Sequence, residues 1–476
     1  MSNPFPFVLF LLTVAILYQV WTSAPWRQAV LVIASLVFLG SFSQSWQAYV
    51  PLLVFLAFGY IALKWIQASP GVFVPVLVLT VVTFIWLKQY AFVPHAWFLP
   101  FPYVTIGLSY LFFRVLHLMI AARNKALPEN PDIVSYFIYT ANFLTLASGP
   151  IQLYPDYVKE RNFSLNRRVS MAENTQGVER IIKGLFKTNV LALVFSTIRT
   201  QAMDTVMNTG ASPVSKLFGA ALMLAAYPLF LYCNFSGFID LVIGGGHLLG
   251  LKLPENFKRP FASENFMDFW SNRWHITLSS WLKTYVYNPM LVGMMRRIHS
   301  VALEPFLGVL AFFVTFFLVG IWHGQNTEML LYGVLLGLGV SVNKLFQVLM
   351  TKQMGRKQFT ALSSGAIYTA FSRGLTFTYV AITLVLFWSN WRQMQTLKAS
   401  LGTGLALATC GVILLGSTFV LWLWESARAR ILAGSGNLAP FSHYMRVAVS
   451  TALLVALLTI SLLMNQQAPD IVYKAF

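Results

Sequence analysis

The stretch LEPFLGVLAFFVTFFLVGIWHG (residues 303–324) is an apolar run that ends on a single imidazole, His323, and a second apolar run follows at residues 328–349. A run of this kind is typical of a helix that crosses a bilayer, whose hydrocarbon core requires about 20 apolar residues. A titratable side chain at membrane depth is costly and usually serves chemistry or a partner, although a histidine at a helix end can also be satisfied by backbone. The stretch therefore predicts a membrane span with a candidate functional histidine at its end.

The composition extends this prediction to the whole chain. Hydrophobic residues make up 57% of the 476 residues, charged residues only 10%, and apolar runs recur from one end to the other. We therefore expect an all-α polytopic membrane protein with about twelve crossings of ~20 residues each. No polar block is long enough to fold by itself, so residues 1–476 are predicted to form a single membrane-embedded domain. The first apolar run, residues 7–20, has no Lys or Arg before it and is predicted to be an uncleaved span.

The net charge of +18 at first suggests an anionic partner. Lys and Arg are spread over short loops and form no stripe interleaved with aromatic residues, which argues against nucleic acid. The excess of Lys and Arg in cytoplasmic loops of membrane proteins explains the charge better. We expect residues 123–125, 159–187, 252–259, 296–297, 344–357 and 428–430 to face the cytoplasm, and residues 207–213, 324–327 and 389–400 to face the other side.

Two apolar runs do not fit a simple alternation of sides. Basic residues flank residues 133–146 at both ends, and a single crossing would place these flanks on opposite faces of the membrane. A crossing by residues 216–231 would likewise return the chain to the cytoplasm before residues 235–251 begin. Both 133–146 and 235–251 are therefore predicted to re-enter or to lie shallow, which is tolerated only around a protein-lined or water-filled cavity.

Residues 254–289 differ from the apolar runs because they are polar, aromatic and basic. Aromatic residues recur in this segment at steps of three and four, which predicts one face of a helix. Trp and Tyr favour the membrane–water boundary, so this face is expected at the level of the lipid headgroups. The residues of the face are Trp270, Trp274, Thr277, Trp281 and Tyr285.

His275 lies in the same segment but on a different face of the expected helix. Asn272 precedes it by three residues and Ser279 follows it by four, so all three side chains could turn inward together. The histidine could equally form a hydrogen bond with a neighbour in an interfacial helix. The residues alone leave both interpretations open.

Other conspicuous residues have simpler explanations. The two cysteines, Cys233 and Cys410, offer neither a disulfide framework nor a metal-ligand spacing, and no metal is predicted. Cys233 has no obvious activating base, and the chain shows no nucleophile elbow, so a covalent intermediate on a side chain is not favoured. The glycines at 244–246 and 333–339 are predicted to serve helix packing. Asp240 lies in an apolar context, where an ion pair with Lys or Arg is the alternative to a role in a cavity.

Four blocks of the sequence stand out, and they are Phe235-Ser-Gly-Phe-Ile-Asp240, Pro254-Glu-Asn-Phe-Lys-Arg-Pro260, Phe269-Trp-Ser-Asn-Arg-Trp-His-Ile-Thr-Leu-Ser-Ser-Trp281 and Gly320-Ile-Trp-His-Gly324. These blocks resemble the membrane-bound O-acyltransferase (MBOAT) family. The similarity covers about residues 100–345 and is greatest to the bacterial branch that acts in alginate O-acetylation and teichoic-acid D-alanylation. Two positions depart from the family pattern, since Gln152 stands where Arg is common and residues 288–297 replace a glycine-rich basic loop.

The resemblance implies a ring of helices around a funnel, with re-entrant and interfacial helices and two histidines near its base. It implies that His323 is a general base, which takes the proton of an acceptor hydroxyl as this hydroxyl attacks a thioester. His275 would orient this base, bind an acyl oxygen or assist proton removal. The residues expected to bind substrate or shape the cavity are Asn272, Arg273, Trp274, Ser279, Trp322 and Asp240.

The function implied is O-acyl transfer, with acetyl as the first choice, from a cytoplasmic thioester to an extracytoplasmic polysaccharide or cell-envelope glycan. The location implied is the bacterial inner membrane. The donor would be acetyl-CoA or an acyl carrier protein, with no bound cofactor. Lys258, Arg259 and Lys283 are expected to form a rim that attracts the anionic donor. The other expected partners are the lipid bilayer, the glycan acceptor and an extracytoplasmic acyltransferase.

Three alternatives remain. D-alanyl transfer from a carrier protein toward teichoic acid would use the same chemistry. A polysaccharide transporter or flippase would also contain re-entrant segments and a polar cavity, but it usually has two matching halves, and the Trp-His block has no second copy. A non-catalytic scaffold for an extracytoplasmic enzyme is the third alternative.

Overall fold

The computed structural model describes residues 4–300, 302–434 and 442–464. Within these ranges the chain is helical apart from turns, loops and one isolated bridge between Phe257 and Trp274, which confirms the all-α prediction. The chain divides into two compact units. Unit 1 comprises Met1–Asn189, Asn234–Glu255 and Ala456–Phe476, and unit 2 comprises Val190–Cys233 and Asn256–Val455. The prediction that the whole chain is one domain stays a prediction.

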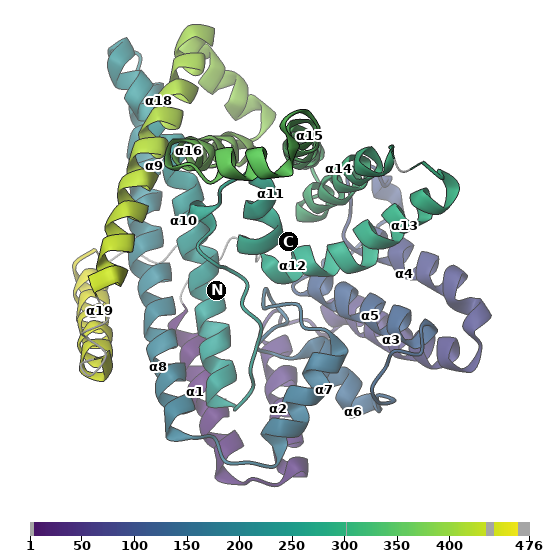
Figure 1. Cartoon of the computed structure of the whole chain (residues 1–476). Coiled ribbons are helices and arrows are strands. Elements are labelled where there is room, and N and C mark those ends of the chain that lie inside the picture. Colours follow the sequence, from purple (N-terminus) through teal and green to yellow (C-terminus); the bar gives the residue numbers. More distant parts are fainter. Residues whose placement is uncertain (1–3, 301, 435–441, 465–476) are drawn as a thin grey trace. The chain divides into compact units, whose positions relative to one another are not determined.

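Unit 1 is built largely from the first eight α-helices (Figure 1). The helices α3, α4 and α5 pack against one another. Short 3-10 turns connect some of the helices, at Trp46–Tyr49, Pro70–Val72 and His95–Trp97. The helices are α1 (Phe5–Val20), α2 (Ala24–Gly40), α3 (Val50–Ala68), α4 (Phe73–Leu87), α5 (Leu108–Arg123), α6 (Ile133–Ala141), α7 (Tyr154–Leu165) and α8 (Met171–Phe186), followed by the later parts of α10 (Pro213–Leu248) and α19 (Ser442–Met464).

Unit 2 contains α9, the first part of α10, and the helices from α11 to α18. The helix α18 runs beside α9 and packs on α16 (Figure 1). Both α15 and α18 bend at a glycine with positive φ, Gly355 and Gly402, a conformation that glycine adopts without steric cost. The bounds are α9 (Ala192–Met207), α11 (Phe266–Asp268), α12 (Ile276–Leu282), α13 (Asn288–Arg297), α14 (Glu304–His323), α15 (Thr327–Ser363), α16 (Ala366–Thr383), α17 (Val385–Trp388) and α18 (Trp391–Gly434), with a 3-10 turn at Pro260–Ala262 and π-helical turns at Lys187–Leu191, Phe269–Arg273 and Lys283–Tyr287.

Eight helical stretches of the described chain are long and apolar enough to cross a membrane, and three shorter apolar helices accompany them. Their number and hydropathy confirm a multi-pass membrane protein. The eight are Trp46–Ala68, Pro70–Leu87, Met171–Met207, Pro213–Leu248, Glu304–His323, Thr327–Ser363, Ala366–Trp388 and Trp391–Ile431, and the shorter three are Phe5–Val20, Ala24–Gly40 and Met445–Ile460.

The apolar run at residues 133–146, which was predicted to re-enter, begins with the short helix α6. It has only nine residues and ends at Asn142, after which the chain continues in turns. Nine residues rise about 14 Å, which is less than half of the ~30 Å hydrocarbon core. The run therefore does not cross as a helix, in agreement with the sequence.

The prediction that residues 235–251 re-enter is wrong. These residues continue the helix that begins at Pro213, and α10 is a single helix of 36 residues that contains Pro228. A helix of this length rises about 54 Å, which is enough for one complete crossing. Residues 216–231 had been taken as a complete crossing by themselves, and joining both runs into one crossing removes the conflict between the basic flanks.

Glycines allow α8 and the later part of α10 to approach closely in unit 1. A Cβ built on Gly177 would lie 2.8 Å from the carbonyl oxygen of Gly244, and one built on Gly184 would lie 2.7 Å from that of Gly237. Such distances leave no space for a side chain. The contact confirms the packing role predicted for Gly244.

The helices α14 and α15 form an antiparallel hairpin in unit 2, and glycines lie at their contact. A Cβ on Gly320 would lie 2.1 Å from the Cα of Gly333, and one on Gly337 would lie 2.8 Å from the carbonyl oxygen of Phe313. This confirms that the 333–339 glycines serve packing. The close approach fixes the end of α14, where His323 lies.

The topology can be tested with single cysteines in a chain whose Cys233 and Cys410 are replaced by serine. Met171–Met207 and Pro213–Leu248 are consecutive spans joined by a short turn. We expect Gly210→Cys in this turn to react with a membrane-impermeant maleimide only from outside the cell, and Arg168→Cys only from the cytoplasm. Reaction of both positions from the same side would contradict the assignment.

Candidate active site

The segment that carries His275 is a series of short helical pieces and not one helix. The pieces α11, Phe269–Arg273 and α12 are separated at Trp274, which is extended, and at His275, which has φ 48° and ψ 50°. The left-handed conformation costs a non-glycine residue about 1–2 kcal/mol, and surrounding contacts must hold it in place. Because of this break, the direction of the His275 side chain does not follow the spacing of a regular helix.

The predicted tryptophan face at the headgroup level is wrong. Trp270, Trp274 and Trp281 are 4%, 2% and 5% exposed, so they lie inside the protein. The Trp274 ring stacks on Phe269 with ring centroids 5.3 Å apart. The spacing of three and four residues had suggested one helical face, but the break at Trp274 and His275 places these rings in a buried aromatic cluster.

Asn256 holds the backbone and side chain around His275. Its backbone carbonyl accepts the Ile276 N–H at 3.0 Å. Its side-chain oxygen accepts from the Thr277 N–H at 3.1 Å and from the Thr277 hydroxyl at 2.8 Å, and it lies 3.3 Å from Nδ1 of His275. Asn256 and His275 are both fully buried. The stretch around Asn256 therefore acts as a clamp across the break.

This clamp determines the tautomer of His275. The Thr277 N–H can only donate, so the Asn256 atom that it meets must be the carbonyl oxygen. An oxygen at that position requires Nδ1 of His275 to carry the proton, which leaves Nε2 as an acceptor. Burial lowers the pKa of His275 to about 3, so the ring is neutral at physiological pH. The clamp thus holds a neutral imidazole in one orientation.

His323 is the last residue of α14 and is also fully buried. Its ring lies between aromatic neighbours, with centroids 5.0 Å from Phe387 and 6.0 Å from Tyr332. Trp322 lies 4.8 Å from the His323 ring and 6.1 Å from the His275 ring. The structure therefore brings the two predicted histidines against the same indole, from segments that are separated by 48 positions in the chain.

Three other predicted site residues form hydrogen bonds within their own segment of the chain. Asn272 and Arg273 both donate to the carboxylate of Asp268, at 3.0 Å and 2.6 Å. The Ser279 hydroxyl donates to the carbonyl of Trp270 at 2.6 Å. These bonds stabilise the irregular path of the segment around His275, and a role in binding substrate stays a prediction.

Asp240 lies in unit 1, on α10. Its carboxylate accepts from Arg180 at 2.9 Å and from Lys187 at 2.6 Å, and Arg180 also pairs with Glu255 at 2.5 Å. The ion-pair alternative for Asp240 is therefore present in the structure. Whether Asp240 also shapes a cavity stays a prediction.

The three residues of the predicted donor rim are exposed on unit 2. Lys258 and Arg259 follow Asn256, and Lys283 begins the π-helical turn after α12. Arg259 pairs with Glu425 of α18, so part of its charge is already neutralised. Their role in attracting a donor stays a prediction.

Residues 78–387 match the membrane-bound O-acyltransferase family. The match covers well over half of the chain, so the chain belongs to this family and is an O-acyltransferase. Both buried histidines, Asn256 and Trp322 lie within the matched residues. The suspected resemblance is thereby confirmed.

Curated relatives fall into two groups. The teichoic acid D-alanyltransferase of Bacillus subtilis (strain 168) is 27% identical over 288 residues, which cover 59% of this chain and 70% of the relative. A probable alginate O-acetylase of Pseudomonas putida is 28% identical over 239 residues, which cover 50% of this chain and 45% of the relative. The chain thus spans less than half the length of that relative.

Proposed function

We propose that the chain transfers an acyl group from a cytoplasmic thioester to a hydroxyl of an extracytoplasmic glycan, in the bacterial inner membrane. The observation that carries this proposal is the pair of fully buried imidazoles, His275 and His323, that lie against Trp322 in a member of an O-acyltransferase family. Hydroxyl groups are weak nucleophiles, and a neutral imidazole is the side chain best suited to activate them near neutral pH.

In the proposed reaction His323 is the general base. The acceptor hydroxyl gives its proton to the neutral ring as its oxygen attacks the carbonyl carbon of the thioester. The new C–O bond forms, the C–S bond breaks, and the leaving thiolate takes the proton from the imidazolium. General-base assistance of this kind contributes about 10²–10⁴ in rate.

His275 has the role of a hydrogen-bond acceptor in this proposal. Asn256 fixes the proton on Nδ1, so Nε2 would accept a hydrogen bond from a second hydroxyl of the glycan while His323 takes the proton of the reacting hydroxyl. The low pKa of the ring supports this role, because a charged imidazolium would have no acceptor to offer. The ring acts by orientation, which lowers the entropy cost of bringing hydroxyl and thioester together.

Acetyl is the first candidate for the acyl group because probable alginate O-acetylases are among the relatives. D-alanyl is the second, because the Bacillus subtilis D-alanyltransferase matches a larger share of both chains. The proposed donor is acetyl-CoA or an acylated carrier protein. The proposed partner is an extracytoplasmic acyltransferase. The two acyl groups differ in charge, since D-alanyl carries an ammonium group.

The proposal is tested with the purified chain in proteoliposomes. Radiolabelled acetyl-CoA or D-alanyl carrier protein is supplied on one side, and a soluble glycan or teichoic-acid fragment on the other. We expect label to appear in the acceptor as a hydroxylamine-sensitive ester. A transporter would instead move labelled glycan across the bilayer without forming an ester, and a scaffold would do neither.

A further inference from the structure

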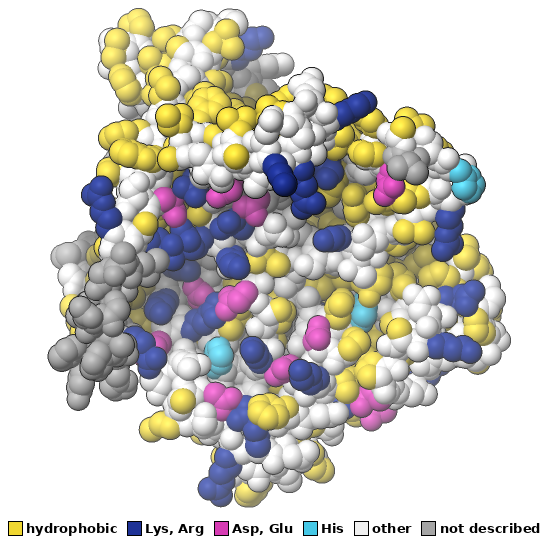
Figure 2. Space-filling view, in the orientation of Figure 1, with side chains coloured by type: hydrophobic (Ala, Val, Ile, Leu, Met, Phe, Trp, Pro, Cys, Tyr) yellow, Lys and Arg dark blue, Asp and Glu magenta, His cyan; other side chains and the backbone are white. Residues whose placement is uncertain are grey.

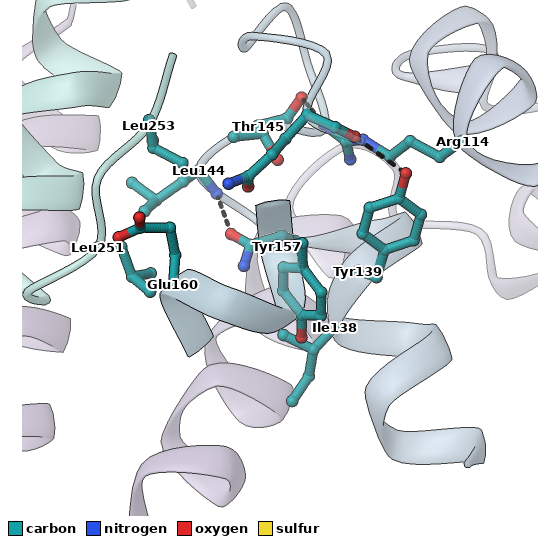
Figure 3. A pocket seen from close by; sticks show the side chains of 11 residues that line it. Arg114, Ile138, Tyr139, Leu144, Thr145, Tyr157, Glu160, Leu251 and Leu253 are labelled. Carbon is teal, nitrogen blue, oxygen red and sulfur yellow. Dashed lines mark hydrogen bonds between the residues drawn. The ribbon is translucent and has the colours of Figure 1, made fainter. Parts of the chain in front are cut away.

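Two arginines of unit 1 show how a guanidinium is usually satisfied in this protein. Arg114 is 1% exposed, lies at the edge of a small cavity (Figure 3), and donates to the carbonyl oxygens of Thr140 and Thr145, each at 2.9 Å. On one face of the protein Lys and Arg are mixed with Asp and Glu (Figure 2), and in unit 1 Arg180 pairs with Asp240 at 2.9 Å. Both arginines thus have oxygen partners within the chain.

Arg199 in unit 2 differs from these arginines. It lies on α9, inside the candidate span Met171–Met207, and is half-buried. Among the residues that the structure describes, no carboxylate pairs with it and no oxygen accepts from its N–H groups. Asp204, the acidic residue of α9, is exposed and lies about 140° around the helix from Arg199. A charge at membrane depth is costly, so this one is a candidate for function.

Two aromatic rings hold the guanidinium of Arg199. Its Cζ lies 5.1 Å from the ring centroid of Trp388 and 5.8 Å from that of Tyr227, and the two rings are 6.1 Å apart. Contacts with ring faces fix the position of a guanidinium but use none of its N–H donors. The donors of Arg199 therefore remain available to a ligand.

The indole of Trp388 adds a second donor beside Arg199. Its Nε1 atom is buried and has no hydrogen-bond partner in the described part of the chain. An indole N–H and a guanidinium can only donate, and a buried donor without an acceptor is costly. Oxygen atoms of an anion would satisfy both groups and would also balance the charge. We call Arg199 and Trp388 together the unit 2 arginine site.

The unit 2 arginine site lies next to the proposed base. Phe387 directly precedes Trp388, and its ring centroid is 5.0 Å from that of His323. Arg199, Phe387, Trp388 and His323 all belong to unit 2. An anionic group held by Arg199 therefore belongs to a molecule whose other groups can reach His323.

The position of Arg199 along α9 favours the acceptor over a lipid. The helix ends eight residues after Arg199, a rise of about 12 Å, and long side chains lean toward the helix N-terminus, away from that end. Residues 207–213 and 389–400, which follow α9 and α17, are expected on the extracytoplasmic side. The Ser400 hydroxyl donates to the carbonyl of Val206 at 2.6 Å and joins the two. Lipid phosphates stay at the headgroup level, whereas the acceptor must enter to reach the base.

We propose that the unit 2 arginine site binds an anionic group of the acceptor glycan, a carboxylate or a phosphodiester, and so selects an anionic acceptor. The inference rests on the proposed function, whose acceptor it narrows. The N–H edge of Arg199 would hold two oxygens of the anion, and the indole N–H of Trp388 would donate to the same group. A hydroxyl of the same glycan would meet His323. A neutral glycan with the same hydroxyls would leave these donors unpaired and bind more weakly.

The test measures binding of charged and uncharged acceptors to the full chain by calorimetry, in nanodiscs of phosphatidylcholine. The probes are a short oligouronate and a short oligomer of glycerol phosphate, each compared with its methylated form, which keeps the hydroxyls and removes the charge. We expect the wild type to bind at least one charged probe about tenfold more tightly than its methylated form, a difference of ~1.4 kcal/mol.

Four variants assign this preference to the site. R199Q should abolish it and leave the Kd of the methylated probe unchanged. R199K should retain part of it, because the charge remains while the paired N–H groups are lost. W388F keeps the stacked ring and removes the indole N–H, so it should cause a smaller loss than R199Q. R296Q removes an exposed arginine of α13 and should behave as the wild type.

Four results would overturn the proposal. They are equal binding of charged and methylated probes by the wild type, an unchanged preference in R199Q, an equal loss in R296Q, and loss of the wild-type preference when phosphatidylglycerol is added, which would assign Arg199 to a lipid phosphate. Acyl transfer to the same probes separates this proposal from the proposed function. A preference that is lost in R199Q, in a chain that acylates no probe, would retain the site and refute the function. Acylation of charged and methylated probes with the same kcat/KM would do the reverse.

Discussion

Replacing His323 with alanine should lower acyl transfer by about 10²–10⁴-fold, because the group that takes the proton of the acceptor hydroxyl is removed. The loss should appear in the turnover number of the purified protein with labelled thioester and hydroxyl acceptor. Binding of the donor should change little, because the proposed base acts on the proton of the acceptor hydroxyl.

The His323 prediction requires a control for packing, because the ring is fully buried among Trp322, Tyr332 and Phe387. Alanine leaves a cavity there, whereas His323→Gln keeps most of the volume and offers no comparable base. His299 is exposed, and His299→Ala serves as the matched control. Near-normal transfer by both His323 variants would refute the assignment of the base. A glutamine variant that is active while the alanine variant is unfolded would point to a structural role.

Replacing Asn256 with leucine should lower transfer about as far as replacing His275 with alanine. The substitution removes the oxygen that Thr277 and His275 share, and each buried donor left without a partner costs about 1–3 kcal/mol. The imidazole would lose both its fixed tautomer and its position. Transfer rates and thermal unfolding are measured together, with Asn124→Leu as an exposed control.

Asn256→Asp separates positioning from folding. Aspartate keeps the oxygen for Thr277 and His275, so the fold should persist, but its carboxylate favours the charged imidazolium and raises the pKa of His275 from about 3. Because the charged ring has no acceptor at Nε2, transfer by this variant should fall as the pH falls through the raised pKa. Wild-type His275 stays neutral over that range. Identical pH–rate profiles for the two proteins would contradict the positioning role.

The sequence was sufficient to predict the membrane class and the family, whereas the roles of both histidines stay predictions. Hydropathy and short motifs depend only on residues that are close in the sequence, so they can be recognised without knowledge of the fold. The count of crossings was less reliable, because residues 216–231, which contain Pro228, and residues 235–251 were taken as separate apolar runs, whereas they form the single helix α10. A proline within a membrane helix does not have to end it, since neighbouring groups can satisfy the freed carbonyl.

The clamp at Asn256 could not be predicted from spacing. Asn256 lies 19 positions before His275, and the two meet only because the chain pairs across the Phe257–Trp274 bridge. The break that makes this pairing possible depends on a left-handed His275, which no pattern of helical residues indicates. Asn256 belongs to the block Pro254-Glu-Asn-Phe-Lys-Arg-Pro260, which resembles the family. A polar amide within this block was the available signal that Asn256 has a role in the site.

The central claim is that the buried histidine pair forms one catalytic unit for acyl transfer. Single-turnover transfer of a labelled acyl group to a hydroxyl acceptor, compared among wild type, His275→Ala, His323→Ala and the double variant, tests it most directly. Residues that act as a unit show strongly non-additive losses, so the double variant should be little slower than the slower single variant. Losses that multiply, or near-normal transfer by His323→Ala, would contradict the account.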